Sequence, residues 1–203
     1  MQGDAKANGL NMKKIFFTGI LSILFVGISF AQTPKIGVTA GLNVSNLTTS
    51  GGGGSSDYKA GFQAGVVADF GLTENFSIIP ELLFSQRGCK YKDINESVTL
   101  NYLQLPINAA YKFDVGYGSK LFIFAGPYLG YGVSATNAKF GSNVGEVKPF
   151  DFGINAGVGY QYDKVFFKLQ CNPGLINLSN YSGSGSSVKN MNAVSVTVGY
   201  YFF

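Results

Sequence analysis

The stretch FDFGINAGVGYQY, residues 150–162, alternates large apolar residues with small or polar ones. Every second position is apolar: Phe150, Phe152, Ile154, Ala156, Val158, Tyr160 and Tyr162. Between them lie glycines and the polar residues Asp151, Asn155 and Gln161. A strict period of two predicts a β-strand with two unlike faces. The polar face is small and poor in charge, so the question is which environment each face meets.

The composition of the chain indicates which environments its surface meets. Charged residues make up 13% of the 203 residues, against about 25% in an ordinary soluble domain. The formal charge is +4 without a basic cluster, which argues against nucleic acid as a partner. The chain has no His, so the commonest general base is missing, and we expect neither an enzyme nor a cofactor. Much of the surface is predicted not to meet water.

The N-terminal region is predicted to be a secretory signal peptide. Lys13 and Lys14 precede the apolar run 15–30, and Ser29-Phe30-Ala31 provides the small-residue cleavage site. The run is short for a spanning helix, and an uncleaved anchor is the alternative. We expect residues 1–31 to form the signal-peptide region, with Met12 as the natural start. Residues 32–203 are then the exported mature domain.

The same alternation recurs along the mature domain. Eight strands are predicted: 35–45, 59–71, 76–87, 98–113, 121–135, 150–162, 165–178 and 192–203. The connections alternate between short turns and longer stretches rich in Gly, Ser and Asn. This order predicts an all-β fold, an eight-stranded antiparallel up-and-down transmembrane β-barrel.

The register of one hairpin can be derived from the pattern. A two-residue turn at Asp163-Lys164 pairs Tyr162 with Val165 and Gly157 with Gln170. Apolar side chains then face apolar ones and polar side chains face polar ones along the whole hairpin, as cross-strand pairing requires.

The two faces of the strands could be arranged in two ways. In a soluble barrel the apolar face points inward, and flat, nearly uncharged strands would be exposed, which invites aggregation. In a membrane barrel the apolar face meets lipid and the small-polar face lines a narrow interior, or lumen. The low charge favours the membrane barrel. We therefore expect Leu42, Ile154, Val158 and Val196 to face lipid.

The charged residues on the polar face are balanced, three acids against three bases, which suggests ion pairs in a confined interior. A catalytic pair of Glu81 and Asp151 is a weaker alternative. The six charged residues and two amide residues together form the predicted structural cluster of the lumen: Asp69, Glu81, Arg87, Lys112, Asp151, Asn155, Lys168 and Gln170.

The prolines and cysteines of the chain bear on the regularity of the strands and on disulfide formation. Pro80, Pro106, Pro127 and Pro173 fall within predicted strands, where each removes a backbone donor, so we expect bulges or irregular pairing there. The two cysteines, at positions 89 and 171, fall on opposite sides of the barrel wall. No disulfide is therefore expected between them.

Several segments resemble the outer-membrane β-barrel domain family of Bacteroidetes, described as porin-like and PorT-type. The segments are KIGVTAGLNVSNL (35–47), IIPELLFSQRG (78–88), YLQLPINAAYKF (102–113), FAGPYLGYG (124–132) and VTVGYYFF (196–203). The resemblance spans about residues 35–203. It implies an outer-membrane location, recognition of the aromatic C-terminus by the assembly machinery, and a link of one branch to protein secretion.

Two functions are compatible with the predicted barrel. In the first, it is a structural or interaction protein whose long loops meet an extracellular partner. In the second, it is a porin-like channel for small solutes. Inward-pointing aromatic residues such as Tyr102, Phe122 and Tyr128 favour a filled lumen and the first function. We expect a monomer in outer-membrane lipid.

Overall fold

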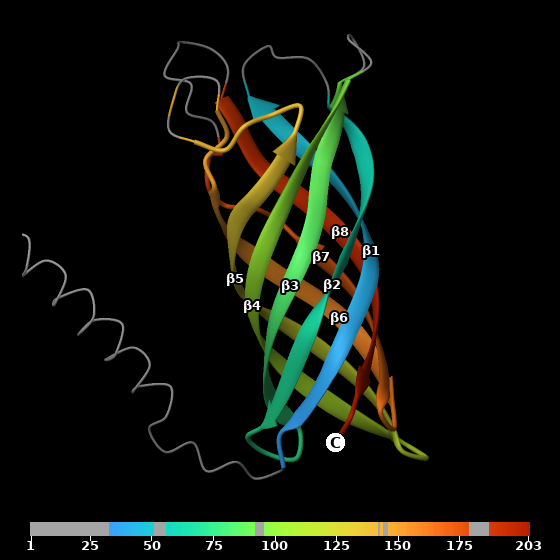
Figure 1. Ribbon diagram of the computed structural model, residues 1–203. Coiled ribbons are helices and arrows are strands. Elements are labelled where there is room, and N and C mark those ends of the chain that lie inside the picture. The colour runs from blue at the N-terminus through green and yellow to red at the C-terminus, as the bar shows by residue number, and fades with distance from the viewer. Residues whose placement is uncertain (1–32, 51–55, 92–95, 142, 144–145, 179–186) are drawn as a thin grey trace, which may run out of the picture. The chain divides into compact units, whose positions relative to one another are not determined.

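The computed structural model describes residues 33–50, 56–91, 96–141, 143, 146–178 and 187–203. The expected signal peptide and Met12 lie outside the described residues. Eight antiparallel strands follow one another in chain order and close into a barrel through pairing of β1 with β8 (Figure 1). The strands are β1 Lys35–Ser50, β2 Ser56–Gly71, β3 Phe76–Tyr91, β4 Glu96–Gly116, β5 Ser119–Thr136, β6 Phe150–Tyr162, β7 Val165–Asn172 and β8 Ser187–Tyr201.

The fold class predicted from the alternation is confirmed. The short turns β2–β3, β4–β5 and β6–β7 lie at one end of the barrel, and the longer connections leave from the other (Figure 1). We call these the short-turn end and the long-loop end. The predicted hairpin register is also confirmed, since Tyr162 pairs with Val165 and Gly157 with Gln170. The described residues contain no helix of the length and hydropathy needed to span a membrane.

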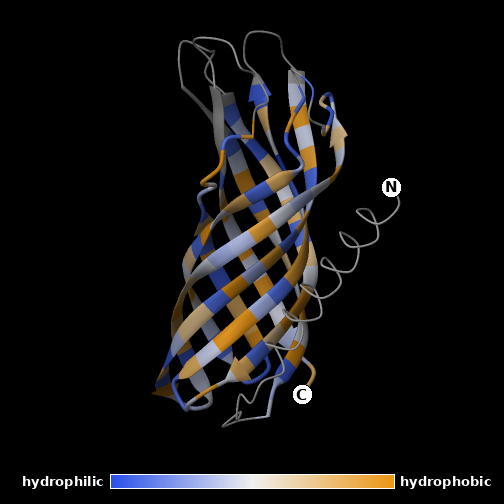
Figure 2. Ribbon diagram, turned by 90° about the vertical axis from the view of Figure 1, so that its left-hand side faces the viewer, coloured by the Kyte–Doolittle hydropathy of each residue, from blue (hydrophilic) through white to orange (hydrophobic). Residues whose placement is uncertain are grey.

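The outer face of the barrel is apolar, and the inner face carries the polar residues together with several aromatic rings, as the alternation predicts. Val158 and Leu42 are 53% and 71% exposed, whereas Asn155 and Glu81 are 1% and 3% exposed. Orange and blue therefore follow one another along the strands in Figure 2. Because a period of two places neighbouring residues on opposite faces, a slip of one residue would exchange the two environments.

The seventh strand is shorter than predicted. Pairing of β7 with β8 ends at Asn172, and the prediction of a strand over 165–178 is wrong beyond that residue. Pro173 has no N–H to donate, but its carbonyl accepts a hydrogen bond from Ile154 N at 3.1 Å. Leu175 N then donates to Phe152 O at 2.8 Å, so the start of this segment remains bonded to β6.

Irregular pairing, one of the two outcomes expected at the prolines, is found at Pro80, Pro106 and Pro127, without a bulge at any of the three. Pairing of β2 with β3 stops at Val67–Glu81 and resumes at Phe70–Ile78 in the same register, leaving Pro80 unpaired on that side. Pro80 still pairs with Ile107 on its other side. Pro106 and Pro127 interrupt one ladder each in the same manner. A missing donor therefore removes local pairs without shifting the strands.

The two cysteines lie on opposite sides of the wall, as predicted. Cys89 is buried, Cys171 is exposed, and no disulfide joins them.

Candidate functional site in the barrel lumen

The lumen collects all eight residues of the predicted cluster. Each is less than 9% exposed. They come from five strands, with Asp69 on β2, Glu81 and Arg87 on β3, Lys112 on β4, Asp151 and Asn155 on β6, and Lys168 and Gln170 on β7. Their alternating phase turns each of them inward, so residues far apart in sequence meet inside the barrel.

The six charged side chains meet as three pairs of opposite charge. Lys168 Nζ lies 2.5 Å from Glu81 Oε1, and Lys112 bonds Asp69. The third pair is wider, with Arg87 Nη1 4.0 Å from Asp151 Oδ2. The Lys168–Glu81 pair joins β7 to β3, which are diametrically opposite in an eight-stranded barrel. It therefore links the two walls across the lumen.

Aromatic rings surround the Lys168 ammonium group. Its nitrogen lies 5.7 Å from the Phe124 ring centroid and 5.6 Å from that of Phe166. Cation–π attraction of this kind is strengthened where water is excluded. Phe166 in turn packs on Tyr201, with ring centroids 4.7 Å apart. These rings fill the lumen towards the short-turn end.

Arg87 is the centre of a second set of contacts, nearer the long-loop end. Its Nη2 donates to Gln104 Oε1 at 3.0 Å, and its Nε donates to Ser85 Oγ at 3.3 Å. Its guanidinium carbon lies 5.3 Å from the Tyr128 ring centroid. The Tyr128 hydroxyl donates to Asp151 Oδ2 at 3.1 Å. The inward phase predicts that Gln104 and Tyr128 face the lumen, but not that they contact Arg87.

A chain of amides connects the strands on the β8 side to Glu81. Ser195 Oγ donates to Asn172 Oδ1 at 3.3 Å, and Asn172 Nδ2 donates to Asn155 Oδ1. Asn155 Nδ2 donates to Asn108 Oδ1, and Asn108 Nδ2 donates to Glu81 Oε1, both at 3.4 Å. The middle of the lumen is therefore cross-linked by hydrogen bonds of amide side chains as well as by ion pairs.

Large rings lie over glycines on the lumen side of the wall. A Cβ atom added to Gly159 would meet Phe122 Cζ at 2.1 Å, and one added to Gly199 would meet Phe166 Cζ at 2.0 Å. Such distances are far below van der Waals contact. Glycine is therefore required at these positions by packing, since the neighbouring ring takes the space of a side chain.

We expect Gly159→Ala to destabilise the barrel by about 1–3 kcal/mol, because the added methyl group overpacks against Phe122. Urea titration in lipid vesicles, followed by the mobility of the folded band on a gel, measures the effect. Adding Phe122→Leu should restore part of the loss by making room. An equal loss with and without Phe122→Leu would contradict the packing argument.

Apolar residues close the lumen at the long-loop end. Phe140 packs edge-on against Tyr102, with ring centroids 5.5 Å apart, and its ring lies where a Gly132 side chain would point. Leu178 is buried in the same group, and Lys148 N donates to its carbonyl at 2.8 Å. The long-loop cluster consists of Cys89, Val98, Leu100, Tyr102, Ala135, Ala138, Phe140, Val147, Ile176 and Leu178. The alternation of residues does not predict this cluster, because irregular loops carry no periodic signal.

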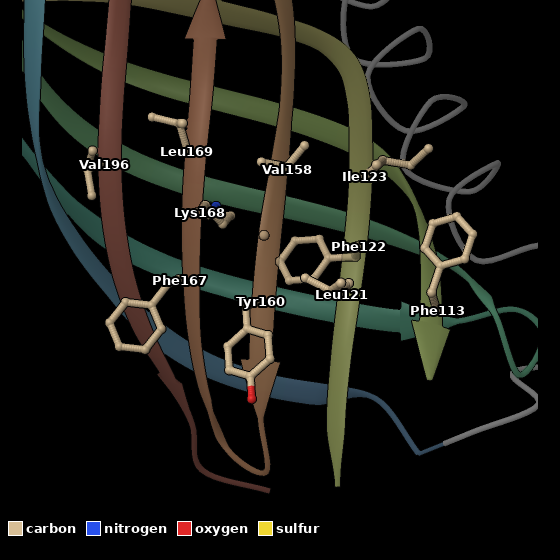
Figure 3. Close-up of a pocket in the computed structure, with 11 residues that line it drawn as sticks. Phe113, Leu121, Phe122, Ile123, Val158, Tyr160, Phe167, Lys168, Leu169 and Val196 are labelled. Carbon is tan, nitrogen blue, oxygen red and sulfur yellow. The ribbon is translucent and has the colours of Figure 1, made fainter. Parts of the chain in front are cut away.

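The outer wall carries an apolar groove of about 460 Å³ around Gly159. Residues of five neighbouring strands, β4 to β8, line it, and Figure 3 shows Ile123, Val158 and Leu169 on the middle three, with Tyr160 nearer the short-turn end. Its outward-facing lining is hydrocarbon and aromatic, so it suits alkyl chains better than a polar ligand. Within the described ranges, no three His, Cys, Asp or Glu side chains are placed to hold a metal ion.

Comparisons with known proteins agree with this architecture. A family profile described as outer membrane protein beta-barrel domain matches residues 30–180. Neisserial surface protein A (NspA) is similar in structure, with a TM-score of 0.51 and 16% identity over 84% of this chain and 100% of that chain. OprG from Pseudomonas aeruginosa gives a TM-score of 0.52 and 12% identity over 84% and 97%. No curated protein sequence matches the chain.

Proposed function

The chain belongs to the outer membrane protein β-barrel domain family and lies in the outer membrane, and we propose that it acts there as a structural or interaction protein. In this proposal the barrel is an anchor, and its long loops meet a partner outside the cell. The outward apolar face is in contact with lipid, and the outer groove around Gly159 takes alkyl chains. The barrel is a monomer without enzymatic activity.

The observation that carries the proposal is the filling of the lumen. Arg87, Tyr102, Tyr128 and Phe166 are each less than 3% exposed. Eight-stranded barrels have interiors just wide enough for side chains, whereas porins with open channels use 16–18 strands. The ion pair between Glu81 and Lys168 and the cluster around Phe140 obstruct the same axis at different levels. These contacts support an anchor rather than a conduit.

The alternative is a porin-like channel for small solutes. The specific observation in its favour is the polar middle of the lumen, where amides and charges lie side by side. For solutes to pass, both the Glu81–Lys168 pair and the long-loop cluster would have to rearrange. The channel is therefore the second candidate.

The segments 78–88 and 102–113 resemble the PorT-type barrels of Bacteroidetes, and this resemblance suggests a kind of partner. We propose a partner belonging to a protein-secretion system, contacted through the long loops. Export through the periplasm and recognition of the aromatic C-terminus by the assembly machinery are parts of the same proposal.

Planar-bilayer recording of the refolded barrel tests the closed lumen. We expect no discrete, stable openings, because side chains occupy the lumen at several levels. A 16-stranded porin refolded in the same lipid provides the positive control for insertion and detection. Reproducible single-channel steps from the wild-type barrel would refute the anchor with a filled lumen and favour the channel.

A further inference from the structure

Four buried polar atoms of the Arg87 group have no hydrogen-bond partner within the protein. They are Arg87 Nη1, Gln104 Nε2, Asp151 Oδ1 and the Tyr102 hydroxyl. All four residues are at most 2% exposed. A buried polar group without a partner is expensive, and native proteins contain few of them. Because the four atoms belong to one group, a single small polar ligand could contact all of them.

The side chains of these four residues lie close together in the lumen. Arg87 Nη2 bonds Gln104 Oε1 at 3.0 Å, which places the other end of that amide near the guanidinium. Gly130 pairs with Gln104 on one side and with Asp151 on the other. Around the position of a Gly130 Cβ atom, Asp151, Tyr102 and Gln104 are the nearest side chains, at 3.2–3.7 Å.

The ion pair between Arg87 and Asp151 is wider than the other two ion pairs in the lumen. Lys112–Asp69 and Lys168–Glu81 are direct contacts, whereas Arg87 Nη1 and Asp151 Oδ2 are 4.0 Å apart. A polar contact longer than about 3.5 Å is a place where a bridging water is expected. The unpaired Arg87 Nη1 and Asp151 Oδ1 are the donor and acceptor that such a bridge needs.

We propose that a structural water molecule is bound between Arg87 and Asp151 in the lumen. The water accepts hydrogen bonds from Arg87 Nη1 and Gln104 Nε2 and donates to Asp151 Oδ1 and the Tyr102 hydroxyl. Buried waters make two to four such bonds, so one molecule satisfies the whole set. An ion is disfavoured, because the opposite charges of Arg87 and Asp151 already balance.

Apolar residues on both sides hold this water. The long-loop cluster, with Phe140 packed on Tyr102, lies between the site and the long-loop end. A second apolar group, which includes Phe122, Phe124 and Phe166, lies towards the short-turn end. The water exchanges slowly with bulk solvent only if side chains fill the lumen, and in this respect the inference rests on the proposed function.

Magnetisation transfer from water, recorded on the wild-type barrel in lipid nanodiscs, tests the site. We expect a cross-peak with the sign of a long-lived water at the Gln104 side-chain amide. Gln63 is the matched control, because it is also buried in the lumen but donates to Thr197 Oγ1 at 3.0 Å. No cross-peak at Gln104 would overturn the water site and leave the closed lumen intact. Equal peaks at both amides would overturn the closed lumen as well.

Tyr102→Phe gives a second, independent test, since it removes only the hydroxyl group. A hydroxyl bonded to water contributes to stability, so its loss should lower the folding equilibrium constant about three- to tenfold. A hydroxyl that is buried without any partner is destabilising, and its removal would raise the constant. An increase in stability of the Tyr102→Phe barrel would therefore refute the proposed water.

Discussion

Lys168→Met should lower the free energy of unfolding by about 3–5 kcal/mol, because it leaves the Glu81 carboxylate buried without its cation. Glu81 is only 3% exposed, so water does not take the place of the ammonium group. Methionine keeps most of the apolar stem between the Phe124 and Phe166 rings. The loss can be measured by urea titration of the barrel in lipid vesicles, with folded and unfolded bands separated on a gel.

The matched control is the double variant Glu81→Gln, Lys168→Met. It removes both charges and keeps an oxygen that accepts the hydrogen bond from Asn108 Nδ2. Its stability should be closer to the wild type than that of Lys168→Met, because breaking a buried pair is more damaging than replacing it. If Lys168→Met costs the same with Glu81 or Gln at position 81, the two charges are not coupled and the pairing across the lumen is wrong.

The inward position of Glu81 and Lys168 could be predicted from the sequence, but their pairing could not. The alternation of apolar and polar residues fixes the face on which each side chain lies, whatever the tilt of the strands. Which residues meet across the lumen depends on the stagger between strands, which sets their relative heights.

Two other features depend on tertiary contacts rather than on local pattern. The residues after β7 keep the alternation of a strand, with Leu175 exposed and Gly174 buried, yet they do not continue the pairing with β8. Phe140 lies in a loop without periodicity, and its position follows from the space left by Gly132 and the ring of Tyr102. Pro173 marks the strand end in the sequence, although only bulges or irregular pairing were expected there, whereas a loop packed into the lumen has no periodic signature.

Val158→Arg should impair folding into bilayers, with an expected loss of about 2–4 kcal/mol for a cation on the lipid face near the membrane midplane. Val158 lies near the middle of β6, is 53% exposed on the outer face and pairs with Ile123 and Leu169. In lipid its neighbours are alkyl chains, which offer no hydrogen bonds to a guanidinium. The folded fraction in lipid vesicles, read from heat-modifiable gel mobility, measures the effect.

Val158→Ile is the control on the same face, and it should fold as the wild type does because it adds only a methylene group in contact with lipid. Gln170→Asn is the control on the inner face, where a smaller amide keeps the polarity of the lumen and should be tolerated better than Arg at position 158. If Val158→Arg folded as well as Val158→Ile, the outer face would not be in contact with hydrocarbon. If Val158→Arg fails to fold while Val158→Ile folds, the charge and not the change of side chain is responsible. That result would show that the apolar residues of FDFGINAGVGYQY face lipid.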